Sequence, residues 1–105
     1  YMSDLKKALG KKIKQIRKEK QLTQERLAEL INIEIPSLSN IETGKFAPSI
    51  ETLQKLSEVL EVEPWEFYYF NEISNEKMKK VIYEKMDKNP SLIKVVYNFI
   101  IALES

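Results

Sequence analysis

The sequence of 105 residues contains no cysteine and no histidine. Without cysteine there is no disulfide framework, no thiolate metal ligand and no thiol nucleophile. Without histidine, Ser-His and Cys-His catalysis cannot be assembled, and a metal site would have to use carboxylates alone. We therefore expect a protein that is not an enzyme and that holds neither a metal ion nor another cofactor.

Glycine and proline are also scarce, with two Gly and four Pro in the whole chain. An all-β protein needs a turn every few residues, so this scarcity favours an all-α fold. No run approaches the roughly 20 apolar residues that span a bilayer. The N-terminal residues also lack the apolar segment of a signal peptide. We expect a cytoplasmic protein without a membrane partner.

The net charge of +1 conceals an uneven distribution of charged residues along the chain. Residues 1–20 carry eight basic and two acidic residues (8 − 2 = +6), and residues 21–71 carry three basic and nine acidic ones (3 − 9 = −6). A basic first segment is suited to phosphate or to an anionic membrane, and it is equally typical of a solvated helix face. Charge alone leaves these interpretations open.

The spacing of the apolar residues, which recur at every third or fourth position, predicts seven helices. The predicted helices are residues 4–20, 24–31 and 35–43, a segment after Ser49, the segment from Pro64 to Phe70, a segment between Ser74 and Asn89, and residues 91–104. In the first, second and fourth helices the residues expected to face inward are Leu5, Leu9, Ile13, Ile16, Leu27, Ala28, Leu30, Ile31, Ile50, Leu53, Leu56 and Leu60.

Local signals mark where several of these helices begin and end. Thr23, Ser49 and Ser74 are predicted N-caps, because a short hydroxyl side chain accepts a free N–H of the first helical turn. Asn32 and Gly44 are predicted to adopt the left-handed conformation that ends a helix. Leu38 and Ile41 are expected to be the inward-facing residues of the short helix between them.

An aromatic cluster occupies positions 65–70, where Trp65, Phe67, Tyr68, Tyr69 and Phe70 lie close together. Aromatic side chains can stack on single-stranded nucleic acid. Three glutamates at positions 61, 63 and 66 would repel phosphate there. We therefore expect this cluster to pack in the core and to form a joint with the last two helices.

The last predicted helix is apolar on nearly all sides, since ten of the residues 92–103 are apolar and only Lys94 and Asn98 are not. Such a helix must be covered on several sides. We expect it to form a self-association surface, with the alternative that it folds back on the aromatic cluster of a monomer. The stripe expected at the dimer interface consists of Leu92, Val95, Val96, Phe99, Ile100 and Leu103.

Two short helices joined by a tight turn suggest a helix-turn-helix unit. Four segments carry a more specific resemblance: Leu9–Arg17, Leu22–Ala28, Leu38–Lys45 and Pro48–Ser49. Together they resemble the Cro/C1-type (XRE family) helix-turn-helix over residues 9–70. The resemblance implies an all-α, five-helix, lambda-repressor-like DNA-binding domain at residues 5–71. A tail at residues 1–4 would precede it, and a C-terminal two-helix hairpin for self-association would follow at residues 72–105.

The resemblance also assigns roles to individual residues. It implies that Gln24 holds a DNA phosphate, that the predicted helix 35–43 is the recognition helix, and that Thr43 and Lys45 grip the DNA backbone. Arg17 and Glu42 match a family pair that forms an internal salt bridge.

The reading face of the recognition helix follows from its helical period, which places Leu38 and Ile41 inward. Asn40 is the best candidate for base readout, because its side-chain amide can pair with adenine N6 and N7. The other candidates for DNA contact on this helix are Ile35, Pro36, Ser37 and Ser39.

Some positions depart from the family pattern. Asn32 stands where the family usually has glycine, and Glu34 stands where it usually has a small hydroxyl cap. Glu34 is a poorer N-cap, and its negative charge would face the DNA. The reading face also has few hydrogen-bond donors, so dimerisation becomes more necessary for tight binding.

These observations predict a sequence-specific regulator of transcription that binds double-stranded DNA. We expect a dimeric repressor that reads a palindromic operator, with a possible regulatory protein partner. The alternative is a protein-interaction module, an antitoxin or an adaptor, that holds a partner through its C-terminal helices.

Overall fold

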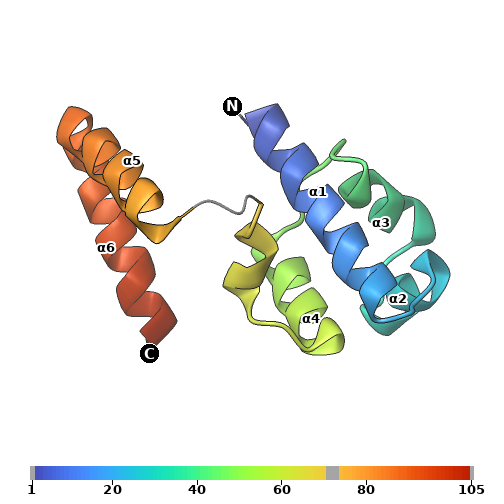
Figure 1. The fold of residues 1–105 in the computed structure, drawn as a ribbon. Coiled ribbons are helices and arrows are strands. Elements are labelled where there is room, and N and C mark those ends of the chain that lie inside the picture. The colour runs from blue at the N-terminus through green and yellow to red at the C-terminus, as the bar shows by residue number, and fades with distance from the viewer. Residues whose placement is uncertain (1, 71–73, 105) are drawn as a thin grey trace. The chain divides into compact units, whose positions relative to one another are not determined.

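The computed structural model describes residues 2–70 and 74–104, and all regular structure in these ranges is helical. The all-α prediction is therefore confirmed. The helices are α1 (Met2–Glu19), α2 (Gln24–Leu30), α3 (Ile35–Glu42), α4 (Ile50–Leu60), the 3-10 helix η1 (Pro64–Tyr68), α5 (Asn75–Lys88) and α6 (Pro90–Glu104) (Figure 1).

The chain forms two compact units, residues 1–71 and 72–105, which are described separately. Within the first unit, α1 already begins at Met2, so residues 2–4 are helical where a tail was expected. The fifth helix of this unit is a short 3-10 helix.

The predicted N-caps form the expected hydrogen bonds. Thr23, Ser49 and Ser74 each accept the backbone N–H of the residue three positions later, at 3.0 Å for the first two and 3.2 Å for Ser74. Glu34, by contrast, makes no side-chain capping bond at the start of α3. Pro36 lies in the first turn of α3, where a backbone N–H has no helical partner to lose.

Left-handed residues end four of these helices. Asn32 and Gly44 adopt positive φ angles of 59° and 80°, as predicted. Gln21 and Glu61 do the same at 60° and 57°, although nothing in their side chains favours this conformation. At each of these ends the chain turns sharply back, so connections of only a few residues bring successive helices together.

The core of the first unit is formed by eleven buried apolar side chains, ten from α1, α2, α3, α4 and η1 and one, Ile31, directly after α2. Three residues that were expected to face inward are exposed instead: Leu5, Leu30 and Ile50. Ile50 is 84% exposed because it is the first residue of α4. Leu5 lies in the first turns of α1, and Leu30 lies at the edge of the inward face that Leu27 and Ile31 define.

Both glycines of the chain lie where α1 meets α3. A Cβ atom at Gly10 would overlap the carbonyl oxygen of Ile41, and one at Gly44 would lie 2.6 Å from the Cα of Lys7. Glycine at these two positions allows the backbones of α1 and α3 to approach closely. The position of α3 against α1 therefore depends on residues without side chains.

The aromatic cluster is only partly packed within the first unit. Phe67 is completely buried and Trp65 is half-buried, as expected of core residues. Tyr68, Tyr69 and Phe70 are exposed, with Tyr69 reaching 58%, so the expectation of core packing was wrong for them within this unit. Consecutive residues of a 3-10 helix point in directions about 120° apart, so Phe67 and Tyr68 cannot both face the core, and Tyr69 and Phe70 lie beyond the end of η1.

The second unit is a hairpin in which α5 packs against α6. Among residues 74–104 no side chain is buried. Leu92 and Val96 are half-buried, whereas Val95, Phe99, Ile100 and Leu103 are exposed, Val95 by 63%. No helix in the described ranges is both long enough and apolar enough to span a membrane.

Candidate nucleic-acid interface

The helix-turn-helix unit consists of α2, a turn at residues 31–34, and α3. The turn is held by a hydrogen bond of 3.0 Å from the Ile33 N–H to the Ala28 carbonyl oxygen. Leu38 and Ile41 of α3 are buried against the rest of the first unit. This burial determines which face of α3 points to solvent.

The outward face of α3 carries the residues predicted to read DNA. Ile35, Pro36 and Ser37 are exposed at the N-terminal end of the helix, while Ser39 and Asn40 are half-buried. These side chains offer small polar groups and two apolar surfaces, which suit thymine methyl groups and a few base-edge hydrogen bonds.

The C-terminal end of α3 places Thr43 and Lys45 at the surface. The carbonyl oxygen of Asn40 accepts the backbone N–H groups of Lys45 at 2.9 Å and Phe46 at 3.2 Å, and the Thr43 hydroxyl at 3.3 Å. The Lys45 ammonium lies 5.6 Å from the centre of the Phe46 ring. Phe46, which was not among the predicted site residues, is exposed beside this lysine.

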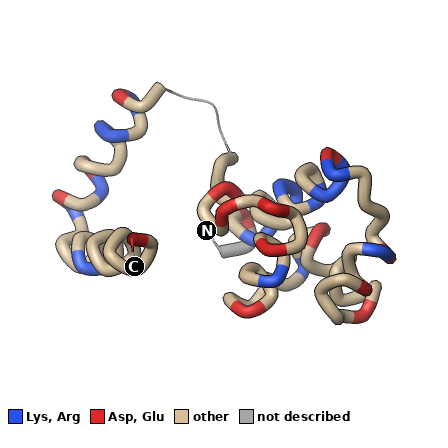
Figure 2. The backbone as a smooth tube through the Cα atoms, turned by 90° about the horizontal axis from the view of Figure 1, so that it is seen from below, with Lys and Arg blue, Asp and Glu red and all other residues tan. Residues whose placement is uncertain are grey.

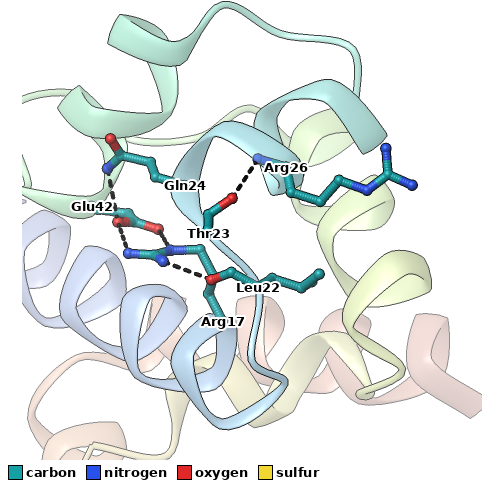
Figure 3. A network of polar contacts seen from close by, with 6 residues as sticks. All are labelled: Arg17, Leu22, Thr23, Gln24, Arg26 and Glu42. Carbon is teal, nitrogen blue, oxygen red and sulfur yellow. Dashed lines mark hydrogen bonds and ion pairs between the residues drawn. The ribbon is translucent and has the colours of Figure 1, made fainter.

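A buried ion pair joins α1 to α3. The Arg17 Nε donates to Glu42 Oε2 at 2.7 Å, and its Nη2 donates to Oε1 at 3.1 Å. The third nitrogen of Arg17, Nη1, donates to the Leu22 carbonyl oxygen at 2.9 Å (Figure 3). The side chains of Arg17 and Glu42 are only 8% and 2% exposed. The structure thus contains the pair that the family resemblance implied, and the same arginine also holds the turn before α2.

Gln24 joins this network from the start of α2. Its Nε2 donates to Glu42 Oε1 at 3.0 Å, and the residue is half-buried. Arg17 and Gln24 approach the carboxylate from opposite sides (Figure 3). Gln24 and Glu42 are 18 positions apart, so no local pattern in the sequence could have indicated their contact.

The charges on the first unit are separated. Basic residues recur along α1, and acidic residues recur from the end of α4 through η1 (Figure 2). The exposed Glu34 stands next to the N-terminal end of α3. Within the described ranges no group of three or more carboxylates is arranged to hold a metal ion.

Residues 13–67, more than half of the chain, match the helix-turn-helix family. The chain belongs to this family. The resemblance to XRE-type helix-turn-helix regulators is therefore confirmed, and with it the five-helix arrangement of the first unit.

Curated relatives of this helix-turn-helix chain include regulators and a repressor. It is 42% identical over 67 residues to the HTH-type transcriptional regulator PuuR of Escherichia coli (strain K12), a match that covers 64% of this chain and 36% of the relative. It is 40% identical over 55 residues to the immunity repressor protein of Bacillus phage phi105, covering 52% of this chain and 38% of the relative. The chain thus spans little more than a third of the length of these relatives.

One solved structure with a helix-turn-helix fold matches residues from both units of this chain. It is a complex of a SinR protein with a SinI protein, with a TM-score of 0.55 and 27% sequence identity. The match covers 92% of this chain and 99% of the matched chain.

Proposed function

We propose that this helix-turn-helix protein binds double-stranded DNA in a sequence-specific manner and regulates transcription as a repressor. The observation that carries this proposal is the outward face of α3, which is held in place by the buried Arg17–Glu42 pair and by Leu38 and Ile41. The names of its relatives as transcriptional regulator and immunity repressor support the same function.

In the proposed complex the N-terminal end of α3 enters the major groove. Ile35 and Pro36 contact thymine methyl groups, Ser37 and Ser39 serve bases or phosphates, and Asn40 pairs with adenine. Three residues outside the reading face bind phosphates and set the register on the duplex: Gln24, Thr43 and Lys45.

The proposed protein is a homodimer that forms through the hairpin. Val95, Phe99, Ile100 and Leu103 of α6 are exposed in the second unit, and a second copy supplies the same apolar surface to cover them. A two-fold dimer presents its two recognition helices about 34 Å apart, which matches successive major grooves on one side of the duplex.

Sequencing of the genomic DNA that the purified protein retains tests the proposal. We expect one recurring palindromic site with half-sites about one helical turn apart. A protein that retains no genomic fragment even at low salt contradicts the proposed function.

A second candidate function, a protein-interaction module such as an antitoxin or an adaptor, is favoured by the exposed hairpin. The SinR and SinI complex, which matches both units, is a complex of two different proteins. Co-purification of a second protein in a fixed ratio, in place of a homodimer, would favour this alternative.

Replacing Lys45 by alanine tests the phosphate contact at the end of α3. Each neutralised phosphate contributes about −0.9 to the slope of log K against log salt concentration on duplex DNA. We expect Lys45→Ala to make this slope shallower by about 0.9 and to weaken all DNA sequences alike. Lys55→Ala removes the same charge on α4, where Lys55 pairs with Glu51 at 3.5 Å, and should leave the slope unchanged. Equal slopes for wild type and Lys45→Ala contradict the assignment.

Replacing Asn40 by alanine tests the reading face. We expect the preference for one base pair in each half-site to fall by about 1–3 kcal/mol, because the amide pairs with one base edge. Binding to non-specific duplex should be nearly unchanged. Selection of binding sites from a randomised library, with wild type in parallel, measures this preference. A uniform loss across all sequences would show that Asn40 does not read a base.

A further inference from the structure

The carboxylate of Glu42 accepts three N–H groups from two residues. Two come from Arg17 and the third comes from Gln24 Nε2. Burial differs along this network: the Glu42 side chain is 2% exposed, while Gln24 is half-buried and therefore reaches the surface. Of these two residues, Gln24 is therefore the one with appreciable exposed surface.

The orientation of the Gln24 amide is determined by its two proposed acceptors, the Glu42 carboxylate and a DNA phosphate. A carboxylate and a phosphate diester both accept hydrogen bonds and donate none, so each can only meet the NH₂ end of a glutamine. The Nε2 atom carries two hydrogens, and Glu42 takes one of them. The other hydrogen remains for an acceptor outside the network.

Arg17 is needed for this arrangement because of charge. A lone carboxylate one amide away from the DNA backbone would repel it. The guanidinium makes two hydrogen bonds to the same carboxylate, at 2.7 and 3.1 Å, and cancels its charge. The network thus presents a neutral, oriented donor at the first turn of α2.

We propose that Glu42 is a positioning residue for DNA binding: it holds the Gln24 amide so that its second N–H meets a DNA phosphate, and Arg17 neutralises its charge. Glu42 therefore does more than orient the recognition helix. The inference rests on the proposed function, because it explains how the protein orients the side chain that makes one of the proposed phosphate contacts.

Two double variants separate positioning from stability. Arg17→Met with Glu42→Gln removes both charges but keeps an oxygen that can accept the Gln24 N–H. Arg17→Met with Glu42→Leu removes both charges and that oxygen. Gln24→Ala is then introduced into wild type and into each double variant. The affinity for a mixed-sequence duplex of about 30 base pairs is measured at about 50 mM salt, where phosphate contacts dominate.

We expect Gln24→Ala to weaken binding about tenfold in wild type, where the carboxylate holds the amide in one orientation. In the double variant with Glu42→Gln the factor should be intermediate, because a glutamine can hold the Gln24 amide in either orientation. In the double variant with Glu42→Leu the factor should fall below about twofold, because the amide is no longer oriented. The control is Gln15→Ala, which removes an amide that donates to Glu19 at 3.2 Å on α1 and should change nothing. The same factor in all three backgrounds overturns the inference.

The outcomes distinguish this inference from the proposed function. Wild type that binds no duplex contradicts the proposed function. Wild type that binds while Gln24→Ala has no effect overturns the inference and the phosphate contact of Gln24, but not DNA binding by the protein.

A spectroscopic measurement on the wild-type chain does not depend on how the variants fold. In the ¹⁵N-labelled protein we expect both side-chain hydrogens of Gln24 to be slowed in exchange once DNA is bound, but only one in the free protein. Two freely exchanging hydrogens in the complex overturn the inference.

Discussion

Replacing Arg17 by alanine is expected to lower the free energy of unfolding by about 3–5 kcal/mol, the largest loss from any basic residue of α1. The reason is the position of Glu42, whose side chain is 2% exposed and whose other side-chain partner is the neutral amide of Gln24. Without the guanidinium, a buried carboxylate keeps its charge uncompensated. The Leu22 carbonyl oxygen also loses its donor from Arg17 Nη1.

Urea unfolding followed by circular dichroism measures this loss. The matched control is Lys14→Ala, which removes a basic residue from the exposed side of α1 and should change stability by less than about 0.5 kcal/mol. The double variant Arg17→Met with Glu42→Leu should recover much of the loss, because an apolar pair leaves no buried charge. A double variant no more stable than Arg17→Ala would contradict a direct energetic link between the two residues.

Removing the hairpin is expected to convert a dimer into a monomer and to weaken operator binding by about 100-fold or more. The full chain should sediment as a dimer at micromolar concentration, and a chain that ends at residue 71 should sediment as a monomer. The physical reason is the apolar surface of α6, which exposes Val95, Phe99, Ile100 and Leu103. The effect on DNA follows because two linked recognition helices bind two half-sites with a high effective concentration.

A point substitution tests the same surface without shortening the chain. Phe99→Asp places a charge in the apolar stripe and should shift the protein to a monomer, since burying an unpaired carboxylate is costly. Asn98→Asp introduces the same charge at an exposed polar position of α6 and should leave the dimer intact. A monomeric wild-type chain would contradict the proposed homodimer and would favour the interaction-module alternative.

The local sequence predicted most of the helix boundaries. Thr23, Ser49 and Ser74 start helices because a hydroxyl three residues before a free N–H satisfies that donor without help from the rest of the fold. Gly44 and Asn32 end helices because their φ angles reach the left-handed region at little cost. Such signals act over three to five residues, so a single sequence contains them in full.

The candidate site was predictable for a different reason. The outward face of α3 follows from helical period once Leu38 and Ile41 are assigned to the core, and both are buried. The resemblance of four segments to one family then implied the Arg17–Glu42 ion pair, which the structure contains, and a phosphate contact for Gln24, which stays a prediction.

The exposure of several apolar residues depended on the tertiary structure. Periodicity predicts on which side of a helix a residue lies, but not whether the core covers that part of the helix. Ile50 was therefore expected to face inward, whereas it is the first residue of α4 and is exposed. Core packing was predicted for the aromatic cluster because its glutamates repel phosphate, but η1 ends at Tyr68, and Tyr69 and Phe70 beyond it are exposed.

By itself, then, the sequence determined that this chain is all-α, where most helices start and stop, and to which family it belongs. Only the tertiary structure decided how closely α1 approaches α3 over Gly10 and Gly44, and that Gln24 shares Glu42 with Arg17. These contacts join residues that are 18 or more positions apart in the chain. Their geometry depends on how whole helices pack, and no short pattern of residues encodes it.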